Sequence, residues 1–287
     1  MRISFSRAQT KEACGRQYKY RYVDRLTSVL RPFALAFGSA VDKAISGYVY
    51  RHALGQCFET VSCFEEAWAK EISENQVQYP QHWDAAVARE VGVTMCEKFP
   101  EVWDRSNLVA VVDSNGVPIV QRRIIAPLPK NHEVEMILDV MVTSLDSGET
   151  AVLDFKTASQ VMSPESPFGH NSLQLSTYQY GADYEFGDWT GPVSNVGFME
   201  FIKRKPPKKS GMGPTIEDPL MFPRRGPDSI REMQQIFVAH ADSINKGEFF
   251  RHSKGAYNSP CDMCDFARLC TRNDRQGIIE RPARRAA

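Results

Sequence analysis

The sequence has neither a long apolar run nor a surplus of charge of one sign. Its 287 residues include 35 basic and 35 acidic side chains, so composition makes no global case for nucleic-acid binding. No segment approaches the roughly 20 apolar residues that a membrane-spanning helix needs. Residues 1–22 are polar and basic and lack the apolar core of a signal peptide. We therefore expect a cytoplasmic protein with no membrane partner.

Disulfide bonds are also not expected, because cytoplasmic thiols are kept reduced. Three of the seven cysteines lie in segments with helical periodicity and are interpreted as ordinary thiols: Cys57, Cys63 and Cys96. The other four are placed differently. Cys261, Cys264 and Cys270 form a C-x2-C-x5-C segment, and Cys14 stands near the opposite end of the chain. Four thiolates can hold either Zn²⁺ or an iron–sulfur cluster, which would link the two ends of the chain. We call Cys14, Cys261, Cys264 and Cys270 the clip cysteines.

The first third of the chain is predicted to be helical. Apolar residues recur at helical spacing in three segments: residues 33–50, 59–75 and 84–103. Before them, Ser6 is predicted to cap a helix that runs through residues 18–22. We predict a helical region over residues 1–107, which also holds the first cysteine of the clip.

The middle of the chain is predicted to be rich in strands. Residues 108–112 and 117–126 are predicted to form a hairpin around the turn Ser114-Asn115-Gly116. Further elements follow in this order: strands at 134–145 and 150–156, a helix at 172–184, a strand at 195–203, a loop at 205–227 and a helix at 227–246. This pattern indicates an α/β fold with a central mixed sheet flanked by helices. We assign residues 108–256 to this core and 257–287 to a C-terminal cysteine segment with a basic tail, all within one compact domain.

Two neighbouring predicted strands carry charged side chains among apolar ones. Asp139 lies in the first, and Asp154 and Lys156 lie in the second. Because side chains alternate faces along a strand, Asp154 and Lys156 point the same way. If the strands pair, two carboxylates and an ammonium meet at one place. Such charges are costly in an apolar strand unless they are paired or bind a metal ion.

Two interpretations fit this cluster. Carboxylate and backbone oxygens suit Mg²⁺ or Mn²⁺, and such an ion activates water and neutralises charge on a phosphate. The alternative is a structural aspartate–lysine ion pair, which these two strands alone support equally. Gln174 and Tyr178 share one face of the predicted helix that follows, and Asp42 on the helix at 33–50 offers a third carboxylate.

Together these motifs resemble the PD-(D/E)xK nuclease superfamily over nearly the whole chain. Within it they are similar to the RecB-like exonucleases with a four-cysteine iron–sulfur cluster, a group that includes the AddB nuclease domain and the CRISPR-adaptation exonucleases. The resemblance rests on Asp139, the D-x-K motif Asp154-Phe155-Lys156, the Q-x3-Y motif from Gln174 to Tyr178, and the four clip cysteines. The opening Ile3-Ser4-Phe5-Ser6 and the run Tyr18-Lys19-Tyr20-Arg21-Tyr22 are similar to the N-terminus of that group.

The resemblance implies a restriction-endonuclease-like core and a role for each residue. Asp139, Asp154 and the Phe155 carbonyl would hold Mg²⁺ or Mn²⁺, and Lys156 would serve the attacking water. Gln174 and Tyr178 would contact DNA or support the site. By the same resemblance, a [4Fe–4S] cluster is favoured over Zn²⁺ on these ligands: Cys14, Cys261, Cys264 and Cys270.

The chain departs from the family pattern in two places. Asp42 stands where relatives often have a histidine ligand, and an aspartate there favours a hard ion over a softer one. Met136 stands where relatives often have a glycine three residues before the first aspartate. Neither change removes the core site.

The resulting hypothesis is a metal-dependent DNA exonuclease acting on single-stranded DNA or DNA ends, in recombination, repair or CRISPR-adaptation-like processing with protein partners of those pathways. Cations in residues 16–25 and 203–209 are candidate phosphate contacts, and Tyr18 and Tyr20 are candidates for stacking on unpaired bases. The alternatives are a non-catalytic DNA-binding or regulatory module on the same scaffold and a structure-specific endonuclease.

Overall fold

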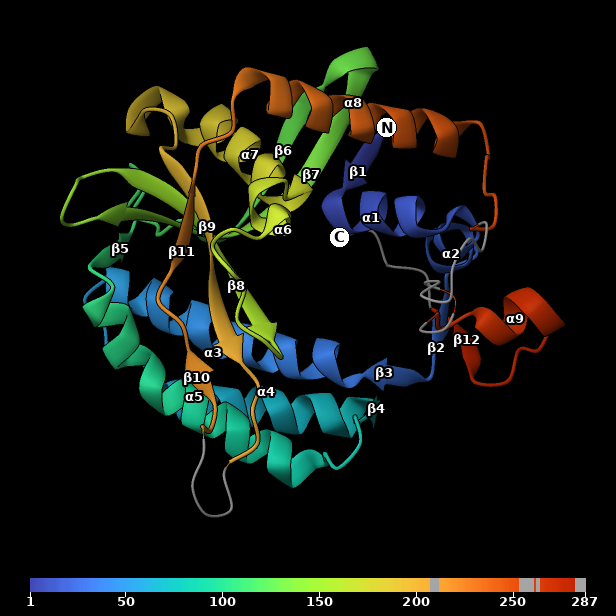
Figure 1. The fold of residues 1–287 in the computed structure, drawn as a ribbon, viewed down its shortest axis with the longest axis horizontal. Coiled ribbons are helices and arrows are strands. Elements are labelled where there is room, and N and C mark those ends of the chain that lie inside the picture. Colours follow the sequence, from blue (N-terminus) through green and yellow to red (C-terminus); the bar gives the residue numbers. More distant parts are fainter. Residues whose placement is uncertain (207–211, 253–260, 262–263, 282–287) are drawn as a thin grey trace.

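A mixed β-sheet lies between two groups of helices in the computed structural model, which describes residues 1–206, 212–252, 261 and 264–281 (Figure 1). Its eight strands follow the order β1-β7-β8-β9-β10, with β5 and β6 also paired to β7 and β11 also paired to β9. They are β1 (Arg2–Ser4), β5 (Leu108–Ala110), β6 (Val120–Leu128), β7 (His132–Ser144), β8 (Thr150–Ala158), β9 (Asn195–Ile202), β10 (Thr215–Ile216) and β11 (Leu220–Pro223). The predicted fold class, a central mixed sheet flanked by helices, is confirmed.

Three long helices cover one face of the sheet: α3 (Phe33–Ala53), α4 (Thr60–Glu74) and α5 (Ala85–Arg105). Their apolar stripes meet Leu153 and Phe201 of the sheet in a first core that contains Phe37 and Phe99. Asp84 caps α5, since its Oδ1 accepts the Val87 N–H at 2.8 Å. These helices match the three predicted from apolar spacing within a few residues.

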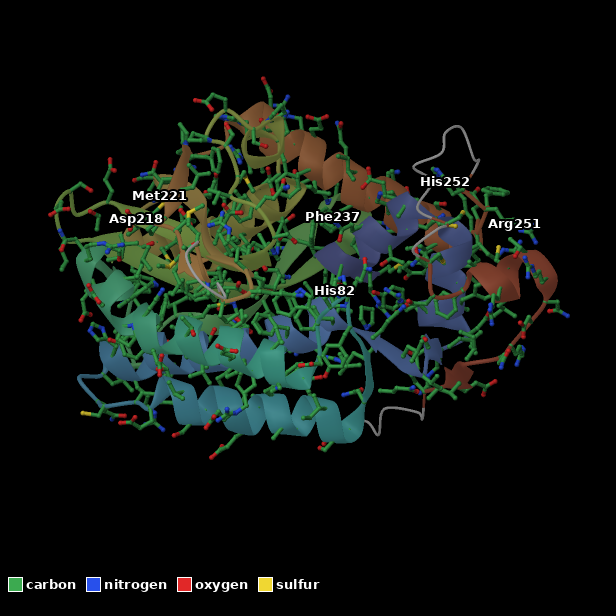
Figure 2. All side chains as sticks on the ribbon, turned by 60° about the horizontal axis from the view of Figure 1, so that its bottom comes forward. His82, Asp218, Met221, Phe237, Arg251 and His252 are labelled. Atoms are coloured by element: carbon green, nitrogen blue, oxygen red, sulfur yellow. The ribbon has the colours of Figure 1, made fainter. Side chains whose placement is uncertain are left out.

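The other face is covered by α1 (Phe5–Ala13), α7 (Leu173–Thr190) and α8 (Pro227–Asn245). Leu175 of α7 and Phe237 of α8 (labelled in Figure 2) pack with Met136 and Phe198 of the sheet in a second core. Ser172 caps α7 by accepting the Leu175 N–H. Within the described part of the chain, none of the helices has the length and apolar character that crossing a bilayer requires.

The C-terminal strand β12 (Ile278–Glu280) lies beside a segment from the first tenth of the chain (Figure 1). It pairs antiparallel with β2 (Leu26–Ser28). Leu26 also packs with Phe266 and Leu269 in a small third core next to α9 (Ala267–Arg272). Short elements complete the fold: α2 (Gly15–Tyr18), the π-helical turn η1 (Lys19–Val23), β3 (Leu30–Pro32), which pairs with β4 (Gln76–Gln78), the 3-10 turn η2 (Pro129–Asn131) and α6 (Pro167–His170).

Three local predictions were wrong. The first helix is capped by Ser4 rather than Ser6, because Ser4 Oγ is the atom that accepts the Arg7 N–H. The predicted loop at 205–227 contains the edge strands β10 and β11, which are too short to leave a clear alternating pattern.

The predicted hairpin is the third correction. Its turn forms, but β5 and β6 both pair with β7. The chain between them is joined by the bridge between Val112 and Pro118 and by the Ile119 N–H, which donates to the Val111 carbonyl at 2.7 Å. Pro118 has no N–H to donate, so a longer ladder between the two strands cannot form there. The 13-residue strand β7 is long enough to pair with both.

Close approach of α4 and α5 depends on Gly92. A Cβ atom at this position would lie 1.9 Å from Cζ of Phe64, whose ring is fully buried. We expect Gly92→Ala to lower the free energy of unfolding by about 1–3 kcal/mol through overpacking, despite the better helix propensity of alanine. Chemical denaturation measures this change. The matched control is Gly187→Ala in α7, where a Cβ meets nothing within 4 Å and alanine should stabilise the helix. Equal stability gains in both variants would contradict the packing argument.

Candidate active site

Asp139 and Asp154 lie where strands β7 and β8 separate. The ladder between these strands ends at the pair Val140 and Leu153, so each aspartate is the next residue beyond it. The Phe155 N–H, which no longer has a β7 carbonyl opposite it, donates to Asp139 Oδ2 at 2.9 Å. The end of the ladder therefore brings the two predicted carboxylates together and holds one of them by a backbone hydrogen bond.

Asp154 is almost completely buried, with 1% of its surface exposed. Gln174 Nε2 donates to Asp154 Oδ1 at 2.8 Å and to the Tyr178 hydroxyl at 3.0 Å. Lys156 Nζ lies 2.7 Å from Asp154 Oδ2. The structure thus unites the predicted D-x-K strand and the predicted Q-x3-Y helix in one hydrogen-bonded group.

Asp42 reaches the same site from helix α3. It lines a pocket of about 280 Å³ together with Asp139, Phe155 and Lys156, between α3 and the end of β8. Its Oδ1 accepts hydrogen bonds from Ser46 Oγ at 3.1 Å and from Gln121 Nε2 at 3.1 Å. The third carboxylate expected from the sequence therefore lies beside the other two.

Burial raises the pKa values of all three aspartates, and repulsion between carboxylates adds to the effect at Asp42 and Asp139. Desolvation raises the pKa of Asp139 well above its ordinary value, and the nearby charges of Asp154 and Asp42 raise it further. Desolvation also raises the pKa of Asp154, against the opposing effect of the Lys156 ammonium. The pKa of Asp42 is raised chiefly by burial, while the Ser46 hydrogen bond lowers it. Positive charge placed among these carboxylates would relieve their repulsion.

The donor set suits a hard divalent cation. Asp42 and Asp139 each use one oxygen in the hydrogen bonds above, and no described residue donates to the other oxygen. Carboxylate oxygens of this kind are ligands that Mg²⁺ and Mn²⁺ prefer, and so is a backbone carbonyl such as that of Phe155, which follows Asp154 in the chain. Among the described residues, however, no group of three or more His, Cys, Asp or Glu side chains is already arranged to hold a metal ion. The residues fit such an ion by their chemistry, without a complete cage.

Three polar residues near the site were not foreseen. Ser46, four residues after Asp42 on one helix face, was detectable from spacing alone. Gln121 lies on strand β6, far from Asp42 in sequence, so no local sequence pattern predicted its contact with Asp42. Glu200 is 4% exposed and lies beside Lys156 in the β8–β9 ladder, where its Oε2 accepts the Met162 N–H at 2.8 Å. This bond anchors the segment that follows β8 next to the site.

The structure corrects the predicted base-stacking role of Tyr18. This side chain is 2% exposed and stacks on Phe249 with ring centroids 6.0 Å apart, so it cannot reach a nucleobase. Tyr20 packs against Phe266, with ring centroids 5.5 Å apart. Both aromatics hold the terminal segments together.

Several predicted phosphate contacts already have protein partners. Lys19 pairs with Asp24 at 2.6 Å, and Arg21 pairs with Asp265 at 2.7 Å. Of the basic run at 203–209, Lys203 lies over the Phe33 ring and Lys205 lies over the Trp83 ring. Residues 207–209, and the tail from residue 282, lie outside the described residues.

The four clip cysteines line one small pocket of about 40 Å³: Cys14, Cys261, Cys264 and Cys270. Cys14 lies at the break between α1 and α2, and its Sγ accepts the N–H of His252 (labelled in Figure 2) at 3.4 Å. Burial raises the pKa of Cys264, and the neighbouring Cys14 and Cys261 add to the effect. Residues that are far apart in sequence thus meet at one place with four sulfur donors.

A mixed sheet with a D-x-K strand, a facing strand aspartate and flanking helices defines a restriction-endonuclease-like protein. The model of the PD-(D/E)XK nuclease superfamily matches residues 2–271, and the chain belongs to that superfamily. It is therefore a nuclease by family, with DNA as the substrate class, and nucleases of this superfamily typically use Mg²⁺ or Mn²⁺.

No curated protein matches the chain. One solved structure to which it is similar is the crystal structure of SSO0001, with 8% sequence identity, coverage of 85% of this chain and 87% of that chain, and a TM-score of 0.35. A similarity at this level carries no argument about function.

Asp139 is expected to destabilise the metal-free protein near neutral pH. Its folded-state pKa is raised above the unfolded value, so stability is lost as the pH rises through the folded-state pKa. Asp139→Asn removes this ionisation and keeps an oxygen for the Phe155 N–H. The free energy of unfolding, and with it the melting temperature, should rise above that of wild type near neutral pH. The gain over wild type should shrink as the pH falls. Thermal melts in EDTA between about pH 5 and pH 8 test this.

The matched control is Asp188→Asn, a substitution of the same kind at an exposed position of α7. It should leave the melting temperature and its pH dependence unchanged. A lower melting temperature for Asp139→Asn at every pH would show that the charged carboxylate stabilises the fold, contrary to this expectation.

Proposed function

We propose that the chain is a Mg²⁺- or Mn²⁺-dependent DNA exonuclease that hydrolyses phosphodiester bonds at DNA ends or in single-stranded DNA. The observation that carries the proposal is the convergence of Asp42, Asp139 and Lys156 on one pocket, with the buried Asp154 paired to Lys156, in a chain of a nuclease superfamily. Recombination, repair or CRISPR-adaptation-like processing is the setting that its sequence motifs favour.

Each residue has a defined task in this proposal. Asp139, Asp154 and the Phe155 carbonyl would hold the divalent ion, with Asp42 as a further ligand. The ion would supply charge neutralisation at the phosphate and an activated water. Lys156 is 37% exposed and borders the pocket, so its ammonium can orient the attacking water and stabilise negative charge on the phosphate.

Gln174 and Tyr178 support the site rather than take part in the chemistry. The Gln174 amide holds Asp154 Oδ1, which leaves Asp154 Oδ2 toward Lys156. Tyr178 is 6% exposed, and its hydroxyl accepts the second bond of the same amide. We therefore assign both residues to the orientation of Asp154.

The position of the pocket supports action on ends or single strands. The pocket lies between α3 and the sheet, with Ala34 and Leu35 on one side and Phe155 and Phe201 on the other. We propose that a single strand or a frayed end enters between these two sides, which favours an exonuclease over an endonuclease that cuts within intact DNA.

The four clip cysteines are proposed to hold a [4Fe–4S] cluster, with Zn²⁺ as the alternative. Four thiolates are a complete ligand set for either group. The cluster would tie α1 and α2 to the C-terminal segment, where Arg21 and Asp265 and the strands β2 and β12 already meet. Its role would be to stabilise the joined ends, because it closes a very long loop.

Asp154→Asn and Lys156→Ala are each expected to lower DNA cleavage by at least about a hundredfold, because they remove a ligand and the charge beside the phosphate. End-labelled single-stranded DNA and closed circular DNA, incubated with Mg²⁺ or Mn²⁺, provide the assay. Wild type should degrade the linear substrate and leave the circle intact.

Lys70→Ala, at an exposed position on α4, is the matched control and should cleave as wild type does. Circular dichroism must show that all variants are folded. Cleavage of circles by wild type would favour an endonuclease. If wild type binds DNA but cuts neither substrate with either ion, the chain is a binding module on a nuclease scaffold.

Purified without oxygen, the protein should be brown, with broad visible absorption and about four iron atoms per chain. Cys14→Ser should lose both the colour and the iron and should melt at a lower temperature. Cys57→Ser, at an exposed thiol away from the clip, should change neither. A colourless protein with one zinc ion per chain would show that the four cysteines hold zinc rather than a cluster. A metal-free protein as stable as the metal-loaded one would contradict the proposed stabilising metal site.

A further inference from the structure

Gln121 has a backbone conformation that is unusual for its place in a strand. It is the second residue of β6, and its φ of 51° lies in the left-handed region that few residues other than glycine adopt. Such a residue costs on the order of 1 kcal/mol and tends to occur where function requires it. The register pairs Val120 with Val140 and Arg122 with Leu138, so Gln121 lies at the level of Asp139.

The Gln121 side chain crosses to helix α3. Its Nε2 donates to Asp42 Oδ1 at 3.1 Å and to Ser46 Oγ at 3.0 Å, and Ser46 Oγ donates to Asp42 Oδ1 at 3.1 Å. The two protons of the amide serve the two bonds, and the Ser46 hydroxyl both accepts and donates. The three side chains therefore form a closed network between β6 and α3.

Core packing does not explain this arrangement, because Gln121 is exposed and belongs to no apolar cluster. Both hydrogen bonds to Asp42 end on Oδ1, and no described residue donates to Oδ2. The donors are neutral, so they orient the carboxylate without cancelling the negative charge that a cation would need. The network leaves one oxygen of Asp42 available at the pocket.

We propose that Gln121 and Ser46 are positioning residues that fix Asp42 as the third carboxylate ligand of the divalent-ion site. The inference rests on the proposed nuclease function, since it assigns roles around the same ion. It goes beyond that function by placing one determinant of metal affinity on β6. Groups that orient a ligand in this way typically change metal affinity by about 10–100-fold when they are removed.

Gln121→Gly is the sharpest test, because glycine adopts the left-handed backbone without strain and removes the side chain that carries the amide. Titration calorimetry with Mn²⁺ on the metal-free full chain should show an affinity lower by about tenfold or more. Ser46→Ala should shift the affinity in the same direction. In the cleavage assay, the Mn²⁺ concentration for half-maximal rate should rise, while the rate at saturating Mn²⁺ stays near that of wild type, because every ligand remains.

The matched control is Asn107→Gly. Asn107 has nearly the same φ, 53°, and lies between α5 and β5, where it has no contact with the site. This variant should bind Mn²⁺ as wild type does. It separates the effect of relaxing a left-handed residue from the loss of the Gln121 amide.

The outcomes distinguish this inference from the proposed function. If wild type binds Mn²⁺ and cleaves DNA but Gln121→Gly has unchanged Mn²⁺ affinity, the positioning role is rejected and the nuclease stands. If Gln121→Gly keeps its Mn²⁺ affinity and loses rate at saturation, Gln121 acts on DNA rather than on Asp42, and the inference again fails. If wild type neither binds Mn²⁺ nor cleaves, the proposed function itself is rejected.

Discussion

Three neighbouring carboxylates with restricted access to water are the constraint on which the site depends. Burial raises the pKa values of Asp42, Asp139 and Asp154, and repulsion between carboxylates adds to the effect at Asp42 and Asp139. Each accepts hydrogen bonds from neighbouring donors: the Phe155 backbone, the Gln174 amide, and the pair Ser46 and Gln121. Lys156 supplies a cation beside Asp154. A cluster of negative charge of this kind is suited to bind a metal ion. The rigidity of the fold keeps the three carboxylates in position to bind it.

That rigidity comes from a sheet with a separate core on each face. Helices α3, α4 and α5 pack on one side and α1, α7 and α8 on the other, and the β7–β8 ladder ends at Val140 and Leu153, two residues of the first core. Strand β7 carries residues of both cores, with Leu138 in the second and Val140 in the first. Asp139 therefore lies where the strand passes from one core to the other. The site sits at the place where regular pairing stops and side-chain hydrogen bonds replace it.

The C-terminal segment is joined to residues 21–28 by interactions of a different kind from those of the site. Backbone pairing of β2 with β12, the small apolar core around Leu26 and the part-buried Arg21–Asp265 ion pair join residues 21–28 to residues 265–280. These contacts are few. The four cysteines at the same place would add a stronger link. Tyr18 belongs to this link, and its burial against Phe249 makes the predicted base-stacking role wrong. Tyr20 is half-buried against Phe266, and its role stays a prediction.

The sequence by itself determined the features that lie within one element. The D-x-K strand, the Q-x3-Y helix, the long helices and the C-x2-C-x5-C segment all depend on spacing over a few residues, which strand and helix geometry turn into shared faces. The tertiary structure alone decided which faces meet. Gln121 lies far from Asp42 in sequence and reaches it only through the β6–β7 register and the packing of α3 on the sheet. The pairing of β5 and β6 with β7 rather than with each other, and the burial of Tyr18, have the same origin. Long-range register and packing involve the whole core at once, so no local pattern encodes them.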